Sequence, residues 1–316
     1  MPEPGLAEDL RAAVAGTVSA DEPLAAHTTM RVGGPAKAYL RAEDRADVAA
    51  AGRLCARHEA PWLILGRGSN LLVADSGWPG VVVALGRRFR GVQVDGEGVV
   101  AGAAEPMPVL ANALARHRLG GLAFGVAIPG TLGGAVRMNA GAHGHELREV
   151  LEWAEVARLD REGAVERLTA ADLRMAYRHT ALPSDAVVLR ARLRLRHADA
   201  ETLAGQMAEM RRWRREHQPI NEPSCGSVFR NPEGDSAGRL IEAAGMRGHR
   251  VGGARISEKH ANFITCAPGT TARDVHRVIR DVQAEVAARH GVELRTEVVL
   301  AGFAGTGEPA DSRATG

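Results

Sequence analysis

One long glycine-rich stretch constrains this chain more than any other segment. Residues 120–144, GGLAFGVAIPGTLGGAVRMNAGAHG, carry eight glycines and little charge. Side chains this small bury little core surface of their own, but they let the backbone come close to a ring system or a phosphate. The stretch therefore favours a site for a flat or extended ligand, although a purely structural loop would have the same composition.

A second glycine loop lies about 60 residues earlier in the chain. It runs GRGSN over residues 66–70, between two short apolar runs that we expect to be strands. Its glycines allow a sharp turn that presents consecutive N–H groups, as a pyrophosphate requires. No GK[ST] follows and no helix is opened, which excludes a Walker loop and a GxGxxG fingerprint. A plain tight turn is the alternative, but the two segments together favour a large extended cofactor.

Composition sets the class of protein. The 316 residues suffice for about two domains, and 45% hydrophobic with 25% charged residues is typical of a globular chain with a large core. We expect no transmembrane helix and no secretory signal, and hence a cytoplasmic location. The net charge of +2 gives no footprint for nucleic acid or for a membrane surface.

Metal and disulfide chemistry find no support in the sequence. The three cysteines, Cys55, Cys225 and Cys266, are odd in number and form no CxxC pair, and the twelve histidines form no HExxH motif. We therefore expect no metal site. Lys37 and Lys259 are the only lysines, which hints at a need for a compact ammonium group, although genome bias toward arginine explains them equally well.

Changes in composition and hydrophobic pattern along the chain predict its domain organisation. Residues 1–19 are expected to form a helix and a connector. A strand–helix–strand unit with the first glycine loop covers 20–90, and hairpins with one helix cover 91–197. Charged and amphipathic helices with a final strand at 293–303 make up 198–303, and the polar tail 304–316 is expected to be disordered.

Four polar side chains stand out. Tyr177 and Arg178 lie in MAYRHT just before a strand, Ser227 lies in CGSVFRNP, and Glu297 lies in the apolar final strand TEVVLAGF. Each has an ordinary structural interpretation when taken singly. A carboxylate in an apolar strand nevertheless needs a partner or a proton, because burying an unpaired charge is costly.

Taken in order, the motifs HTTMRVGGPA, LGRGSNLLVAD, GLAFGVAIPGTLGGAVRMNAGAHG, YRHT, PSCGSVFRNP, AGRLIEAAGMRG, ISEKHANFI and RTEVVLAGF resemble the UDP-N-acetylenolpyruvoylglucosamine reductases over residues 28–303. The resemblance implies an α+β protein with a two-subdomain FAD-binding fold of the vanillyl-alcohol-oxidase type and a C-terminal α/β substrate-binding domain. The short interval between Arg178 and Ser227 resembles the shorter form of the family, which lacks a tyrosine-bearing insertion.

The activity that the resemblance implies has two halves. NADPH delivers a hydride to FAD, and the reduced flavin passes a hydride to C3 of UDP-N-acetylglucosamine enolpyruvate, with protonation at C2. The product, UDP-N-acetylmuramate, is a precursor of bacterial peptidoglycan. Alternatives are another FAD-dependent oxidase or dehydrogenase of this fold, acting on a small alcohol or hydroxy acid, and a non-catalytic nucleotide-binding module. A monomer is expected, with no nucleic-acid or membrane partner.

The resemblance also assigns residues. It implies that Arg178 and Glu297 stabilise the substrate carboxylate and that Ser227 donates the proton. The implied substrate-binding residues are Tyr177, Arg230, Asn231, Lys259 and Asn262. The implied FAD-binding residues are Gly66, Arg67, Gly68, Ser69, Asn70, Gly130, Thr131, Gly133, Gly134, Asn139 and Gly141. FAD is expected to be noncovalent, while the sequence leaves open a link to a histidine such as His27. Two positions depart from the commoner family pattern: Cys225 stands where alanine is frequent, and Arg230 where lysine is.

Overall fold

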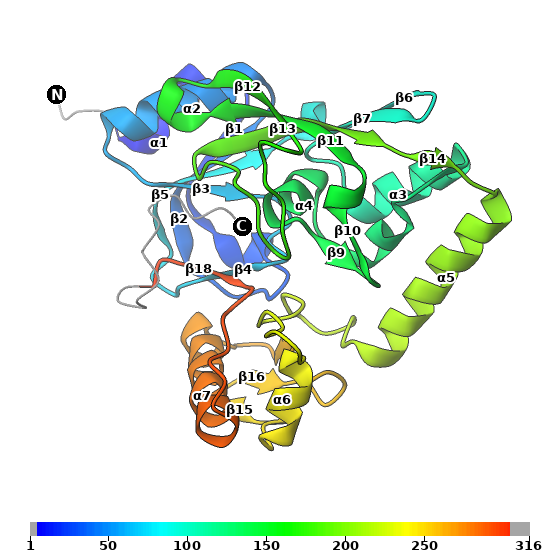
Figure 1. Ribbon diagram of the computed structural model, residues 1–316. Helices are drawn as coiled ribbons and strands as arrows, with labels where there is room; N and C mark the ends of the chain where they lie inside the picture. Colours follow the sequence, from blue (N-terminus) through cyan, green and yellow to red (C-terminus); the bar gives the residue numbers. More distant parts are fainter. Residues whose placement is uncertain (1–4, 304–316) are drawn as a thin grey trace.

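Two sheets and a small C-terminal domain make up the protein in the computed structural model, which describes residues 5–303 (Figure 1). The sheets pack together in the upper part of the view, and the C-terminal domain lies below them. The tail expected to be disordered, 304–316, lies outside the described residues. No helix within 5–303 is long and apolar enough to cross a membrane.

The first sheet has the strand order β1-β2-β5-β3, with β1 antiparallel to β2 and the other neighbours parallel. Asp44 begins the helix beside it, because its carboxylate accepts the N–H of Asp47 in the first turn. The elements are α1 (Leu6–Ala13), β1 (Thr17–Pro23), the 3₁₀ turn η1 (Leu24–His27), β2 (Pro35–Ala42), α2 (Arg45–Arg57), β3 (Trp62–Leu65), β4 (Leu71–Val73), β5 (Trp78–Leu85) and η2 (Arg87–Phe89).

The second sheet is antiparallel throughout, with the order β12-β11-β13-β7-β6. Strand β13 has an arginine face, on which Arg190 pairs with Glu155 and Arg192 with Glu152. The elements are β6 (Val92–Asp95), β7 (Gly98–Gly102), α3 (Met107–Arg116), β8 (Leu119–Gly120), β9 (Gly141–Ala142), β10 (His145–Glu146), η4 (Leu147–Glu149), β11 (Leu151–Arg158), η5 (Leu159–Arg161), β12 (Ala164–Thr169), β13 (Ala186–Arg194) and β14 (Arg196–His197).

The long glycine-rich stretch is partly helical, which the sequence analysis did not anticipate. It contains the 3₁₀ turn η3 (Ala123–Ala127) and the helix α4 (Leu132–Met138). Glycine is a poor helix former, but a Cβ at Gly133 would lie only 3.1 Å from the Cβ of Ala103. The missing side chain therefore lets α4 pack closely against the chain that follows β7.

Helix α5 (Ala200–His217) runs down one side of the molecule toward the C-terminal domain (Figure 1). Its Met207 packs against Ala111 of α3 and Val126 of η3, so this helix shares a core with the second sheet's helices. The sequence predicts a domain boundary at 198, before this helix. The core of the C-terminal domain takes in residues from Cys225 onward, together with Met30, Val32 and Leu72 from the first subdomain.

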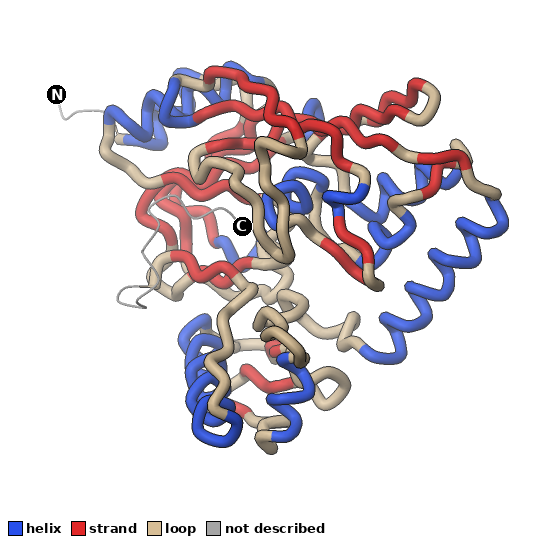
Figure 2. The backbone as a smooth tube through the Cα atoms, in the orientation of Figure 1, coloured by secondary structure: helices blue, strands red, loops and turns tan. Residues whose placement is uncertain are grey.

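The C-terminal domain is a three-stranded antiparallel sheet between helices, with two loops joining it to the rest of the chain (Figure 2). Its elements are α6 (Ala237–Ala243), β15 (Arg250–Val251), β16 (Ala254–Ile256), β17 (Ile264–Cys266) and α7 (Ala272–His290). Thr271 and Asp274 form a capping box that begins α7, and Gly291 ends it in the left-handed conformation.

The final strand is much shorter than predicted. Only β18 (Val299–Ala301) is a strand, and it pairs in parallel with β4 of the first subdomain. Residues before it pair elsewhere: Thr296 forms an isolated bridge with Phe229, and Arg295 accepts the N–H of Arg230. The expectation of one strand over 293–303, with Glu297 inside it, is therefore wrong. Glu297 lies in the bend between the two pairings.

Candidate active site

The two glycine-rich segments meet in space. A Cβ added to Gly66 would lie 2.9 Å from Oγ1 of Thr131, and one added to Gly130 would lie 3.5 Å from Oγ of Ser69. Gly68 has φ of +59°, a conformation that glycine adopts without the strain other residues incur. The first loop and the start of α4 thus face each other across the junction of the two subdomains.

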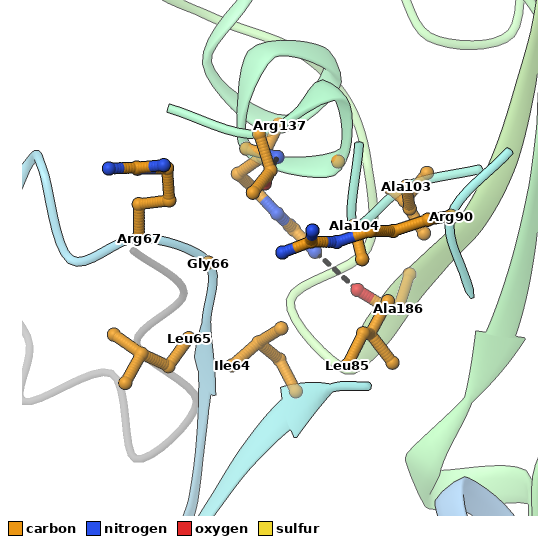
Figure 3. A pocket seen from close by; sticks show the side chains of 14 residues that line it. Ile64, Leu65, Gly66, Arg67, Leu85, Arg90, Ala103, Ala104, Arg137 and Ala186 are labelled. Atoms are coloured by element: carbon orange, nitrogen blue, oxygen red, sulfur yellow. Dashed lines mark hydrogen bonds between the residues drawn. The ribbon is translucent and has the colours of Figure 1, made fainter. Parts of the chain in front are cut away.

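A cavity of about 120 Å³ lies at this junction (Figure 3). It combines small residues, which bring backbone to the wall, with arginine side chains. Its lining residues are Ile64, Leu65, Gly66, Arg67, Leu85, Arg90, Ala103, Ala104, Thr131, Gly133, Gly134, Arg137, Ala186 and Val188. Close backbone approach, apolar walls and positive charge suit a dinucleotide with a pyrophosphate, so these residues fit FAD.

Two of these arginines were missed by the sequence analysis. Arg137 lies on α4 and donates a hydrogen bond to the carbonyl of Ala186 at 2.6 Å (Figure 3). It also donates to the carbonyl of Pro183 at 2.9 Å, and both bonds hold the loop before β13. Arg90 reaches the same cavity from the chain after η2. No local pattern marks either residue in a chain so rich in arginine.

Asn139 braces the loop that carries Arg178. It is fully buried at the end of α4, in the left-handed conformation with φ of 42°. Its Nδ2 donates to Oε2 of Glu146 at 3.0 Å and to the carbonyl of Ala176 at 2.8 Å, and its Oδ1 accepts the N–H of Arg148 at 3.0 Å. The expected FAD-binding residue Asn139 therefore has its amide occupied by protein groups.

Arg178 and Glu297, far apart in the sequence, form an ion pair. Nε of Arg178 donates to Oε1 of Glu297 at 2.7 Å, and Nη2 donates to the carbonyl of Gly141 at 3.1 Å. The two side chains are only 18% and 15% exposed. Arg178 itself has φ of +52°, an uncommon conformation for a non-glycine residue, and its guanidinium lies 5.0 Å from the ring centre of Tyr177.

Glu297 holds its proton more tightly than a free glutamate does. Burial raises the pKa of its carboxyl, and the positive charges of Arg178 and Arg230 oppose that effect without cancelling it. The site thus sets a buried carboxyl, which keeps its proton to a higher pH than a free glutamate, beside the cationic group of Arg178. This combination is suited to negative charge that develops on a bound ligand.

Ser227 lies in a loop that is tied to Glu297 through the backbone. The carbonyl of the next residue, Val228, accepts the N–H of Glu297 at 2.7 Å. On the other side, Asn262 is buried and bonds both backbone groups of Phe229: its Oδ1 accepts the N–H at 2.9 Å and its Nδ2 donates to the carbonyl at 2.8 Å. Asn262 thus fixes the segment that follows Ser227.

Arg230 offers a hydrogen-bond donor to the site. Its Nε is buried and has no hydrogen-bond partner among the described residues. Burying an unsatisfied donor is costly, so this atom is suited to a ligand oxygen. Its charge is close enough to Glu297 to lower the pKa of that carboxyl, which places Arg230 beside the ion pair.

The other expected substrate residues differ in their positions. The hydroxyl oxygen of Tyr177 accepts the N–H of Asn231 at 3.4 Å, across the boundary between subdomain and C-terminal domain. Lys259 is directed elsewhere, because its Nζ donates to the carbonyl of Arg215 near the end of α5 at 2.9 Å. His27, the histidine considered for a flavin link, lies 2.8 Å from Oε1 of Glu22 through its Nε2.

Comparison with known proteins identifies the family of this chain. Residues 36–169 match the FAD binding domain family, and residues 218–301 match the C-terminal domain of UDP-N-acetylenolpyruvoylglucosamine reductase. The chain is 45% identical to the reductase of Heliobacterium modesticaldum over 286 residues, or 90% of each chain. The chain belongs to the UDP-N-acetylenolpyruvoylglucosamine reductase family.

Further members of the UDP-N-acetylenolpyruvoylglucosamine reductase family agree with this assignment. The reductase of Bacillus subtilis is 39% identical, with 93% of this chain and 97% of the relative covered. The crystal structure of the reductase from Thermus caldophilus matches with a TM-score of 0.78 and 38% identity, over 90% of this chain and 98% of that chain. The prediction of an α+β FAD-binding fold with a C-terminal domain is confirmed.

Proposed function

We propose that this protein is an NADPH-dependent flavoenzyme that reduces UDP-N-acetylglucosamine enolpyruvate to UDP-N-acetylmuramate, a step in peptidoglycan precursor synthesis. Family membership supports the reaction. The observation that carries the proposal is the buried pair of Arg178 and Glu297 beside the Ser227 loop. An alcohol oxidase has no need of a proton donor together with a carboxylate-stabilising pair.

The two glycine-rich segments would hold FAD without a covalent bond. When bound, FAD supplies the chemistry that accepts and delivers a hydride. The backbone at Gly66 and Gly130 leaves room for a pyrophosphate because neither position carries a Cβ. Arg67 and Arg90 at the cavity wall supply positive charge. The loop between β3 and β4 would therefore bind the pyrophosphate of FAD, and α4 would form the opposite wall of the cavity.

Arg178 and Glu297 stabilise the substrate carboxylate as it gains negative charge. The guanidinium of Arg178 neutralises charge directly and also keeps the Glu297 carboxyl in place. A raised pKa keeps Glu297 protonated to higher pH than in water, so that it can donate a hydrogen bond where a carboxylate would repel. Both groups are largely shielded from water, which strengthens the interaction.

Ser227 delivers the proton to C2 of the substrate. A serine hydroxyl is a poor acid in water, so it must act through placement, and its neighbours Val228 and Phe229 are held by Glu297 and Asn262. Arg230 then anchors a phosphate or carboxylate oxygen of the substrate with its free Nε. The reacting carbon is thereby set between the serine and the ion pair.

We propose that the protein acts as a monomer, and the proposed site requires no residue from a second copy. It works in the cytoplasm, where NADPH and sugar nucleotides are available. The purified protein should be yellow, its flavin absorbance should bleach with NADPH in the absence of oxygen, and the colour should return on addition of UDP-N-acetylglucosamine enolpyruvate. Return of colour with oxygen alone would favour an oxidase, and no bleaching would favour a non-catalytic module.

A further inference from the structure

The first glycine loop and the carboxylate of Glu297 meet at one end of a small parallel ladder. Asn70 is the last residue of the loop, directly before β4, and Glu297 lies two residues before β18. The two strands pair with Val299 opposite Leu71. The N-terminal ends of both strands therefore bring the loop and Glu297 to the same place.

Asn70 contacts the residues on both sides of this junction. Its backbone carbonyl accepts the N–H of Val299 at 3.0 Å, as the ladder requires. Its side chain makes a second hydrogen bond, in which Nδ2 donates to the backbone carbonyl of Glu297 at 3.0 Å. The side chain thus adds a hydrogen bond beyond the end of the ladder, on the residue that carries the carboxyl.

Glu297 is held by a different segment at each of its polar groups. Its N–H donates to Val228 in the serine loop, its Oε1 accepts from Arg178, and its carbonyl accepts from Asn70. With the peptide groups on both sides of its Cα fixed, the direction of its Cα–Cβ bond is fixed as well, and the bond from Arg178 then holds the carboxyl. Of these three hydrogen bonds, only the one from Asn70 comes from the glycine loop.

We infer that Asn70 is a positioning residue for Glu297, which links the glycine loop to the carboxyl that faces the substrate. The inference rests on the proposed function. It assigns to the Asn70 amide a role distinct from cofactor binding: the amide sets the geometry of the second half-reaction. Displacement of a reacting group by about 1 Å can cost about 100-fold in rate, so loss of this bond should be measurable.

The test compares Asn70→Ala and Asn70→Asp with a control, Asn112→Ala. Asn112 lies on α3, where its Oδ1 accepts a hydrogen bond from Arg211 at 2.7 Å and its Nδ2 donates to the carbonyl of Pro108, so the control also removes asparagine side-chain hydrogen bonds. For each holoenzyme we would measure flavin reduction by NADPH, flavin reoxidation by UDP-N-acetylglucosamine enolpyruvate and the pH profile of reoxidation. FAD affinity is measured by fluorescence titration of the apoprotein, and melting temperature by calorimetry.

For Asn70→Ala we expect FAD affinity and flavin reduction within about 3-fold of wild type, and reoxidation about 10- to 100-fold slower. Asn70→Asp should be slower still, because a carboxylate oxygen would face the Glu297 carbonyl. The alkaline limb of the reoxidation profile should move to lower pH in Asn70→Ala, since a carboxyl released from its buried position is better solvated. In Asn70→Asp the added negative charge raises the pKa of the Glu297 carboxyl and opposes that shift. Asn112→Ala should leave rates and pH profile unchanged.

Normal reoxidation at saturating FAD, with weakened FAD affinity, would overturn the inference and make Asn70 a cofactor ligand only. An unchanged pH profile with equal slowing of both half-reactions would overturn it in favour of a purely structural role. If Asn70→Ala melts too low to assay, the isosteric Asn70→Asp carries the same test. Failure of the proposed function is distinguishable, because the wild-type protein itself would then not be reoxidised by the enolpyruvyl substrate, and the inference would fall with it.

Discussion

Replacing Glu297 by glutamine removes the acidic group of this side chain and keeps its size. Oε1 already accepts from Arg178, so the amide oxygen can take over that bond, and the amide nitrogen occupies the position of the second carboxyl oxygen. The fold and FAD binding should persist. Turnover should fall, because an amide N–H is a weaker donor to a developing anion than a carboxylic O–H.

The magnitude follows from the surroundings of the carboxyl. The side chain is 15% exposed, so water has little room to replace a lost donor. Loss of one such donor to a developing oxyanion typically costs about 10²- to 10³-fold in rate, or about 2.7–4 kcal/mol. Glu297→Ala should cost more, since it also leaves Nε of Arg178 without its acceptor.

Stability should respond to pH with a defined sign. The pKa of Glu297 is raised in the folded protein, so its protonation stabilises the fold below the unfolded pKa of about 4.3, and this contribution is lost as the pH rises through the folded pKa. Glutamine does not titrate. The melting temperature of Glu297→Gln relative to wild type should therefore be higher at neutral pH than at acidic pH.

Single-turnover reoxidation of the reduced flavin by the enolpyruvyl substrate measures the chemical effect, and calorimetry on the same samples measures stability. The reasoning is refuted if Glu297→Gln lowers the melting temperature at neutral pH and reoxidises the flavin within about 3-fold of wild type. Such a result would make the Arg178–Glu297 pair a structural bond, with magnitudes closer to those of a partly buried ion pair than of a catalytic donor.

Three further predictions concern other parts of the site. Ser227→Ala should leave flavin reduction by NADPH near normal and slow reoxidation by about 10²-fold or more, the scale for a lost general acid, as stopped-flow absorbance would report. Gly66→Val should abolish tight FAD binding in a fluorescence titration, because even a Cβ there lies 2.9 Å from Oγ1 of Thr131. Asn262→Leu should lower the free energy of unfolding by about 2–6 kcal/mol in urea, since both backbone groups of Phe229 lose their partner.

Each of these predictions has a matched comparison. Equal slowing of both half-reactions in Ser227→Ala would assign the serine a structural role. Gly205→Val places the same side chain on α5, where a Cβ has nothing within 4 Å, and should bind FAD normally. Near-wild-type stability of Asn262→Leu would show that water satisfies Phe229 in its place.

The parts of the fold that the sequence predicted are those fixed by local chemistry. The start of helix α2 is fixed locally, because its N-cap, Asp44, accepts the N–H of Asp47 within the same turn. Helix α4 was not predicted, because its glycines oppose a helix locally and the contact of Gly133 with Ala103 comes from another element. The final strand was overestimated for a related reason: an apolar run indicates a strand, but it does not show that the pairing partner changes at Glu297.

The candidate site divides in the same way. The glycine loops carry a local signature, so their residues could be named from the sequence. The roles of Arg178, Ser227 and Glu297 were inferred from the family resemblance, since no spacing rule joins residues on such distant segments. Arg90 gave no signal at all, because an arginine that lines a cavity looks like any other in an arginine-rich chain.

The return of β18 to the first subdomain determines how the C-terminal domain can move. Because both the chain entering this domain, 218–224, and the chain leaving it, 291–298, are anchored in the same body, the domain cannot pivot freely about a single linker. Its movement relative to that body is limited to a hinge rotation about the line through its two attachments. Glu297 lies on one attachment and Ser227 directly after the other. Any rotation about that line would therefore displace α6 more than these two side chains.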